Sequence, residues 1–174
     1  MRGRVHIYCG DGKGKTSAAI GLAVRAAGRG RRVTLMRAMK DCDSGEVMLL
    51  SSVPQVYIID TPKELKFVWL MDESEKREYS ELLAAMLRRA RERIASGETD
   101  MLVIDEAMSA VSTGLLPEEE LLDLIRTRPD GLEIVMTGRD PTPALLAEAD
   151  YVTEMKKIRH PYDSGQGARS GIEF

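Results

Sequence analysis

The sequence predicts an α/β protein with three layers, in which helices cover both faces of a mainly parallel central sheet. Short apolar runs alternate with helical stretches along the chain, which is the pattern of βαβ units. A glycine-rich segment follows the first apolar run and opens a helix, and a later apolar run ends in two acidic residues. The carboxyl ends of parallel strands meet at one edge of the sheet, where ligands bind.

Six apolar runs are expected to be strands, over residues 5–9, 32–36, 55–59, 101–104, 132–136 and 151–155. Helices are expected over 16–27 with Gly28 as its stop, over 73–95, from Pro117 onward, and over a short stretch that begins at Pro141 with Asp140 as its cap. Helix 73–95 is the clearest, because an apolar stripe runs along it and Asp72 and Glu75 stand where a capping box belongs.

The composition indicates one ordinary globular domain over residues 1–174, with 43% hydrophobic and 30% charged residues. The formal net charge of −3 creates no overall field for nucleic acid or for an anionic membrane. No apolar run approaches the roughly 18 residues of a membrane span, so we expect a cytoplasmic protein. Residues 156–174 lack periodicity and are interpreted as a C-terminal tail, disordered in the simplest interpretation.

The glycine-rich segment has the character of a phosphate-binding loop. Its members are Gly10, Asp11, Gly12, Lys13, Gly14, Lys15, Thr16 and Ser17. Backbone N–H groups of such a loop wrap an oxyanion, and glycines permit the close approach. Lys15 can reach phosphate oxygens and the Thr16 hydroxyl can coordinate Mg²⁺. The segment therefore predicts a P-loop NTPase-like fold that binds a triphosphate.

The spacing of this loop departs from the common GxxxxGK[ST] pattern. Counting back from Gly14 places Cys9 at the position where a first glycine is usual, so the loop is one residue shorter. A shorter loop still holds phosphates, but in a register that need not suit ordinary transfer of the γ-phosphoryl group.

Two further strand ends supply charged side chains to the same edge. Asp105 and Glu106 end the apolar run 101–104, and either carboxylate could hold Mg²⁺. Arg139 follows the next strand and could stabilise charge on a leaving phosphate. Arg25 lies about two and a half helical turns after Thr16, so it is either a nucleotide contact or a surface charge.

An aromatic pair, Phe67 and Trp69, precedes the Asp72 cap in a segment without a strong structural signal. Packing under a loop is the default interpretation, and an aromatic wall for a large flat ligand is the alternative. The two cysteines, Cys9 and Cys42, lack the spacing of a metal site, and Cys9 is expected to pack in the core. No nucleophile motif accompanies the histidines His6 and His160.

The whole chain resembles the ATP:corrinoid adenosyltransferases. The residues that carry the resemblance are the short GDGKGKT loop, Arg25, the Asp105-Glu106 pair, Thr137-Gly138-Arg139, the segment ADYVTEM from Ala149 to Met155, and the ending HPYDSGQGARSGIEF from His160 to Phe174. The short loop and the C-terminal ending together are far more specific for this family than the glycine-rich loop or the acidic pair alone.

This resemblance implies transfer of the 5′-deoxyadenosyl group of ATP to a reduced Co(I) corrinoid, with release of triphosphate. It implies that the loop from Gly10 to Ser17 binds the triphosphate in reversed orientation, with Lys15 and Arg139 as catalytic residues and Arg25 as a nucleotide contact. Thr16 and Glu106 would hold Mg²⁺ with support from Asp105. Phe67 and Trp69 would lie near the lower face of the corrinoid.

The resemblance also implies a homodimer and makes a flavoprotein-type reductase possible as the source of Co(I), with no nucleic-acid partner. It does not identify the preferred corrinoid, complete cobalamin or an a,c-diamide precursor. Two other functions are consistent with the residues: a P-loop ATPase or kinase that acts on the γ-phosphate, and a nucleotide-dependent regulatory or corrinoid-carrying module without turnover.

Overall fold

The computed structural model describes residues 2–39, 44–61 and 66–172. These residues form a sheet with the strand order β3-β2-β4-β5-β1-β6, and each neighbouring pair is parallel. The strands are β1 (Val5–Cys9), β2 (Val33–Arg37), β3 (Val56–Ile58), β4 (Met101–Asp105), β5 (Glu133–Thr137) and β6 (Tyr151–Glu154). All six lie where the apolar runs predict them, within a residue or two at each end.

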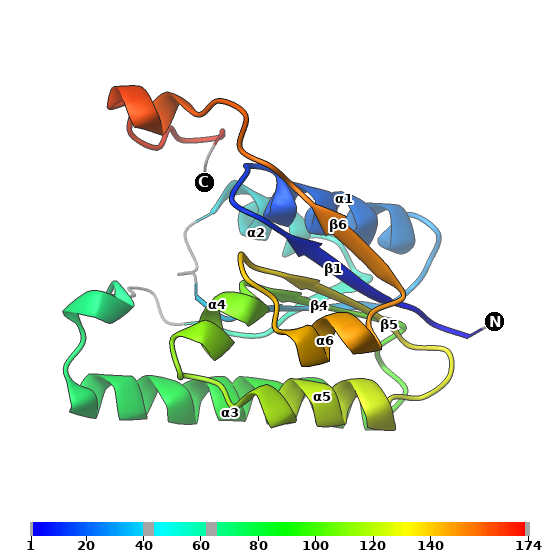
Figure 1. The fold of residues 1–174 in the computed structure, drawn as a ribbon. Coiled ribbons are helices and arrows are strands. Elements are labelled where there is room, and N and C mark those ends of the chain that lie inside the picture. The colour runs from blue at the N-terminus through cyan, green and yellow to red at the C-terminus, as the bar shows by residue number, and fades with distance from the viewer. Residues whose placement is uncertain (1, 40–43, 62–65, 173–174) are drawn as a thin grey trace.

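Helices cover both faces of this sheet (Figure 1). On one face lie α1 (Lys15–Ala27) and α2 (Gly45–Leu50); on the other lie α3 (Glu73–Ala95), α4 (Ala107–Ser112), α5 (Glu118–Thr127) and α6 (Pro143–Glu148). The three-layer α/β/α prediction is confirmed. Among the described residues, no helix is long and apolar enough to cross a membrane.

Two hydrophobic cores hold the layers together. Strands β2 and β4 are buried along their whole length, as the central strands of a parallel sheet are when helices cover both faces. On the α1 side, small side chains such as Ala19 and Ala23 pack against Val103 and Val135. On the α3 side, larger side chains such as Leu83 fill the space above the sheet. Cys9 is buried as expected, whereas Cys42 lies outside the described residues.

The helix α3 begins and ends where the sequence predicts. The Asp72 carboxylate accepts from the N–H groups of Ser74 and Glu75 at 2.8 and 2.9 Å, and the Glu75 carboxylate accepts from the N–H of Asp72 at 3.0 Å. This capping box satisfies N–H groups that have no partner inside the helix. The predicted apolar stripe faces the sheet, with Tyr79, Leu83, Met86, Leu87, Ala90 and Ile94 buried.

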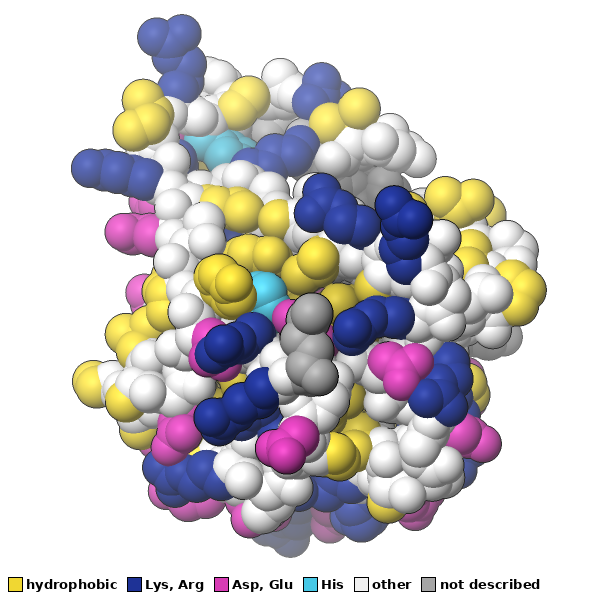
Figure 2. Space-filling model, turned by 90° about the vertical axis from the view of Figure 1, so that its right-hand side faces the viewer, with side chains coloured by type: hydrophobic (Ala, Val, Ile, Leu, Met, Phe, Trp, Pro, Cys, Tyr) yellow, Lys and Arg dark blue, Asp and Glu magenta, His cyan; other side chains and the backbone are white. Residues whose placement is uncertain are grey.

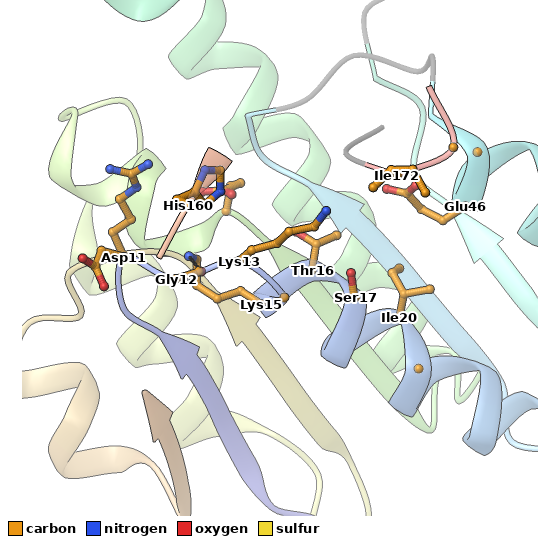
Figure 3. Close-up of a pocket in the computed structure, with 16 residues that line it drawn as sticks. Asp11, Gly12, Lys13, Lys15, Thr16, Ser17, Ile20, Glu46, His160 and Ile172 are labelled. Carbon is orange, nitrogen blue, oxygen red and sulfur yellow. Dashed lines mark hydrogen bonds between the residues drawn. The ribbon is translucent and has the colours of Figure 1, made fainter. Parts of the chain in front are cut away.

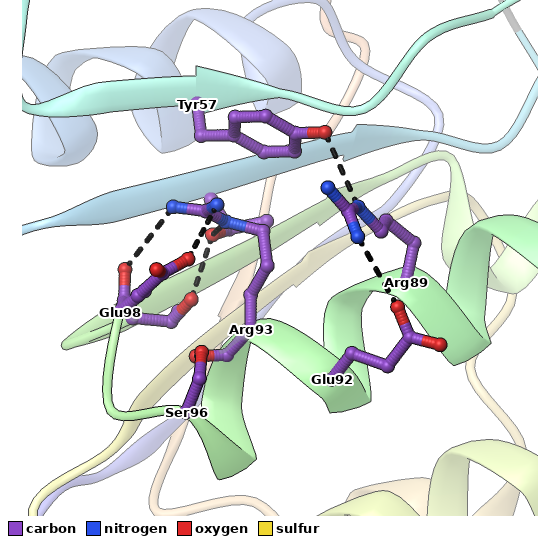
Figure 4. Close-up of polar contacts among 8 residues, drawn as sticks. Tyr57, Arg89, Glu92, Arg93, Ser96 and Glu98 are labelled. Carbon is purple, nitrogen blue, oxygen red and sulfur yellow. Dashed lines mark hydrogen bonds and ion pairs between the residues drawn. The ribbon is translucent and has the colours of Figure 1, made fainter.

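Polar contacts fasten the last turns of α3 to the sheet (Figure 4). The Arg93 guanidinium lies over the ring of Tyr57 in β3, 3.8 Å from its centroid, and Nη1 of Arg93 donates to Glu98 at 2.8 Å. Arg89 donates to the Tyr57 hydroxyl at 3.3 Å. These contacts lie on the face of the sheet opposite α1. They stabilise the packing of α3 on the sheet.

The structure corrects the sequence prediction at four elements. The last short helix starts at Pro143 with Thr142 as its cap, not at Pro141 with Asp140, and the Thr142 hydroxyl accepts from the N–H of Leu145 at 3.2 Å. Helices α2 and α4 were not predicted. In place of a disordered tail, residues 156–172 follow a defined path that includes a short 3₁₀ helix, Pro161–Ser164.

Candidate nucleotide-binding site

The glycine-rich loop leaves the carboxyl end of β1 and leads directly into α1. Gly14 precedes the helix with φ +115°, and Gly10 has φ +98°. Both values lie in the left-handed region that glycine adopts without strain. A Cβ on Gly10 would also lie 2.5 Å from the carbonyl oxygen of Met155. Glycine is therefore required here by dihedral angle and by space, as the phosphate-loop interpretation assumes.

This loop forms one side of a cavity of about 720 Å³ (Figure 3). Every residue from Asp11 to Ser17 lines it, together with Glu106 and Arg139. Gly10 lies just outside, in a smaller cavity on the other side of the loop. The volume suits a nucleotide-sized ligand. The structure thus brings together the predicted loop, one residue of the acidic pair and the predicted arginine.

Lys15 is held by the loop itself. Its Nζ donates to the carbonyl oxygens of Gly10 and Gly12 at 2.7 and 2.8 Å. Burial lowers the pKa of Lys15, and the nearby positive charge of Arg139 acts in the same direction. An oxyanion that enters the loop would favour the charged form of Lys15, as the nearby carboxylates of Glu106 and Asp11 already do in part.

Behind the loop, Asp105 joins three elements. Its Oδ1 accepts from the hydroxyl of Thr16 at 2.9 Å and from the hydroxyl of Thr137 at 2.6 Å. The Asp105 side chain is buried beneath the cavity, with 1% of its surface exposed. The acid is therefore placed to fix the start of α1 against the ends of β4 and β5.

Glu106 has a different position. Within the described ranges it is the one non-glycine residue with positive φ, at +60°, a conformation that costs energy and clusters at functional sites. Its N–H donates to the Thr137 hydroxyl at 2.8 Å, and its carboxylate accepts from the hydroxyl of Ser109. With this backbone conformation Glu106 lines the cavity, whereas Asp105 does not.

The tail contributes to the same cavity. The N–H of Gly12 donates to the carbonyl oxygen of Met155 at 2.6 Å, which ties the loop to the exit of β6. His160, Gly171 and Ile172 line the cavity, and Figure 3 shows Ile172 beside Glu46 of α2, across from the loop. Residue types alone did not identify these members of the site. Their signal was the C-terminal motif that carries the resemblance.

Two predicted ligand contacts lie elsewhere. Arg25 is exposed near the end of α1 and lines a separate cavity at the opposite edge of the sheet. Phe67 and Trp69 do not line the phosphate cavity either. Their rings stack at 4.5 Å between centroids, and 63% and 77% of their surfaces are exposed. The default interpretation of packing under a loop is therefore wrong for this pair.

The oxygen donors near the loop fit Mg²⁺ rather than a softer metal. The Thr16 hydroxyl and the Glu106 carboxylate line the cavity, with the Asp105 carboxylate behind the threonine, and Mg²⁺ takes one or two such ligands with water and phosphate oxygens. No group of three or more His, Cys, Asp or Glu residues gathers as a metal site in the part of the chain that the structure describes.

Comparison with known proteins identifies relatives over the full chain. A family model described as ATP:corrinoid adenosyltransferase BtuR/CobO/CobP matches residues 1–174. The corrinoid adenosyltransferase CobA of Salmonella typhimurium is 31% identical over 175 residues, covering 99% of this chain and 86% of that protein. The corrinoid adenosyltransferase of Pseudomonas aeruginosa is 32% identical over 174 residues, covering 99% and 84%.

Solved structures with low sequence identity share the fold of this chain. ATPases 2 and 3 of EssC from Geobacillus thermodenitrificans match with a TM-score of 0.53 at 14% identity, over 98% of this chain and 35% of that one. EccC from Thermomonospora curvata, in complex with a signal sequence peptide, matches with a TM-score of 0.52 at 18% identity, over 92% and 32%. The chain thus spans about a third of each of these longer structures.

Proposed function

Because the chain belongs to the family of ATP:corrinoid adenosyltransferases, we propose that it transfers the 5′-deoxyadenosyl group of ATP to a reduced Co(I) corrinoid. The observation that carries the proposal is the phosphate cavity, where Lys13, Lys15 and Arg139 meet at a loop one residue shorter than the common pattern. Such a site suits a polyphosphate that leaves as a whole.

In this reaction the corrinoid cobalt attacks the ribose 5′-carbon of ATP. A Co–C bond forms and the C5′–O bond breaks, so the electron pair of the broken bond departs on triphosphate and cobalt passes formally from Co(I) to Co(III). Because cobalt is the nucleophile, no side chain has to remove a proton. The tasks of the protein are to hold the two substrates in line and to stabilise charge on the leaving group.

The loop performs the second task. Lys15 Nζ donates to the carbonyl oxygens of Gly10 and Gly12 and would donate to a phosphate oxygen of bound ATP. Lys13 and Arg139 lie on the same cavity wall, and the N-terminus of α1 adds its partial positive charge. Removing one donor aimed at developing charge costs about 10²- to 10³-fold in kcat.

Thr16 and Glu106 would hold Mg²⁺, with Asp105 orienting the threonine hydroxyl from behind. When bound, Mg²⁺ would neutralise part of the charge on the phosphates. The burial of Asp105 and the presence of Glu106 on the cavity wall favour Glu106 as the direct ligand.

We assign the corrinoid-binding surface to exposed apolar residues. Phe67, Trp69 and Leu70 precede α3, and Met48 and Leu49 lie on α2, directly after the cavity residues Gly45 and Glu46. Exposed apolar patches mark ligand or partner surfaces, and the stacked rings of Phe67 and Trp69 form such a patch before α3. A stacked aromatic pair suits the flat macrocycle, and it would exclude water and an axial ligand from the lower face of cobalt, which favours four-coordinate cobalt and eases its reduction.

One assay tests the reaction: anaerobic incubation with ATP, Mg²⁺ and chemically reduced cobalamin, followed by product analysis. We expect triphosphate and a light-sensitive Co–C product in equal amounts. ADP and phosphate would instead indicate a γ-phosphate enzyme, and absence of turnover would indicate a regulatory module. Lys15→Ala should abolish turnover, and near-normal activity in that variant would refute the assignment of the loop.

The same assay with the a,c-diamide precursor in place of cobalamin would rank the two corrinoids. The homodimer and the flavoprotein-type reductase stay predictions from the family resemblance, and the cytoplasmic location stays a prediction from the sequence.

A further inference from the structure

A second cavity lies at the edge of the sheet opposite to the phosphate loop. Its volume is about 480 Å³, and it lies between the last turns of α1 and the starts of β1, β4, β5 and β6. Leu22 and Ala26 of α1 and Met101 of β4 form an apolar floor. The helix α1 starts at the phosphate cavity and ends here, roughly 20 Å away by the helical rise, so the two cavities are separate.

Arginines surround this second cavity. Five line it, Arg2, Arg4, Arg25, Arg29 and Arg31, against a single carboxylate, Glu133. Figure 2 shows this edge of the molecule, with Lys and Arg side chains around a histidine and a group of hydrophobic side chains. The concentration is local, because the whole chain carries a net charge of −3.

Most of this positive charge has no partner in the protein. Arg4 pairs with Asp150 at 2.6 Å, and Glu133 accepts from Nε2 of His6 at 2.8 Å and from the N–H of Arg4 at 3.0 Å. The other four arginines make no side-chain hydrogen bond or ion pair with residues that the structure describes. The carboxylate of the cavity is therefore occupied, and most of the guanidinium groups are available to a ligand.

An aromatic wall stands beside these arginines. The rings of His6 and Tyr151 are stacked at 4.7 Å with an interplanar angle of 15°. Tyr151 lies on the edge strand β6 and keeps 55% of its surface exposed. A planar ring can extend this stack over the apolar floor, since offset stacking is favourable beyond simple burial.

The charge pattern also argues against a second copy of the chain as occupant. In an isologous dimer the same patch meets itself, so the arginines of one copy would face those of the other, and like charges at an interface are costly. A small ligand with its own negative charge avoids this conflict. Guanidinium groups favour phosphate, which they bind through paired N–H donors.

We propose that this cavity is a second nucleotide site, with the base stacked on the His6–Tyr151 pair and the phosphate held by the arginine rim at the end of α1. It is separate from the ATP that the phosphate loop is proposed to bind as substrate, and goes beyond the proposed reaction. Because α1 connects the two cavities, a ligand here contacts the helix whose other end forms the substrate site.

The test is titration of ¹⁵N-labelled protein with AMP, followed by NMR. AMP has one phosphate, so it should bind the triphosphate loop weakly. We expect saturable shifts at the amides of Leu22, Ala26 and Met101, and the same shifts in Lys15→Ala, whose phosphate loop is impaired. Shifts confined to residues 10–17 would overturn the proposal. This result does not depend on whether the protein forms a Co–C product.

Two sets of variants separate the phosphate and ring contributions. The double variant Arg29→Gln/Arg31→Gln should weaken AMP binding at least about tenfold. The matched double variant Arg77→Gln/Arg88→Gln, which removes two exposed charges from α3, should bind as the unmodified protein does. Equal affinity in the two double variants would refute the arginine rim.

Tyr151→Ala should weaken the binding of AMP severalfold and leave the affinity for inorganic phosphate unchanged. If inorganic phosphate binds the unmodified protein as tightly as AMP does, the cavity recognises an anion alone and the proposed ring contact is wrong.

Discussion

The main-chain N–H of Lys157 donates to Oδ1 of Asp11 at 2.9 Å, across 146 positions of the sequence. This bond is the main cause that lowers the pKa of the Asp11 carboxyl. With the bond from Gly12 to Met155 it fastens the phosphate loop to the first residues of the tail. The tail in turn carries His160 and Ile172 to the wall of the same cavity. The two ends of the chain thus shape one site.

Asp11→Ala should raise the KM for ATP by about two- to tenfold, the range that one ordinary hydrogen bond spans. The reason is positional, because the variant removes one of the two bonds that join the loop to residues 155–157, while Lys13 and Lys15 remain. Steady-state kinetics with ATP as the varied substrate measures the effect. Asp11→Asn keeps an oxygen acceptor and should recover most of the affinity. If both variants behave alike, charge rather than the bond to the tail is responsible.

Thr137→Val should destabilise the protein by about 1–3 kcal/mol, because it leaves the N–H of Glu106 without its acceptor and removes one hydroxyl donor to the buried carboxylate of Asp105. The hydroxyl donates to Asp105 and accepts from the N–H of Glu106, so the variant should also raise the Mg²⁺ concentration needed for half-maximal rate. Urea unfolding and a Mg²⁺ titration of the rate measure the two effects. Thr137→Ser retains the hydroxyl and should restore both; failure to do so would place the role of Thr137 in packing.

Trp69→Ala should raise the KM for the corrinoid about tenfold and leave the Kd for ATP within about twofold, since one aromatic stack contributes about 0.5–1.5 kcal/mol beyond its area. Calorimetry gives the ATP affinity and the adenosylation rate gives the corrinoid KM. Trp69→Phe preserves a ring against Phe67 and serves as the control. An equal loss for both substrates would contradict a corrinoid role.

Asp100→Asn should lower the free energy of unfolding at pH 7 by about 1 kcal/mol, a value reduced for solvent screening because both partners are partly exposed. Hydrogen bonds from Arg32 lower the pKa of Asp100 from 3.8 to about 2. The folded pKa is below the unfolded one, so the stabilisation is present above pH 4 and is lost as the pH falls toward 2. Urea unfolding at pH 7, 4 and 3 should show the two proteins converging. A difference that does not depend on pH would reject the ion pair as its source.

The layers of the fold could be predicted from the sequence because helices and strands are specified by residues that are close together along the chain. The capping box at Asp72 and Glu75, the apolar stripe of α3 and the left-handed glycine before α1 depend on residues within one or two turns. The shared location of the acidic pair and Arg139 follows from the parallel topology, because parallel strands bring their carboxyl ends to one edge of the sheet. Local rules therefore gave most of the phosphate side of the site.

Long-range contacts account for what was missed. Thr142 rather than Asp140 caps α6, where its hydroxyl also contacts Glu118 of α5, a neighbour that no local pattern reveals. The position of Arg25 follows from helix length, since the turns between Thr16 and Arg25 carry it to the far edge of the sheet. The tail has no periodicity, and its course depends on contacts such as the long-range bond from the N–H of Lys157 to Asp11, which no local pattern reveals.

The start of α1 has a consequence for how the protein behaves without substrate. Asp72 caps α3, but Gly14 offers α1 no side chain, and no side-chain cap replaces it. The first turn of the helix therefore has no side-chain cap among the described residues, and phosphate oxygens are suitable acceptors for its N–H groups. In the free protein these amides should exchange with deuterium faster than those of the first turn of α3, and bound triphosphate should slow them. The leaving group of the reaction would then also be the missing cap of the helix.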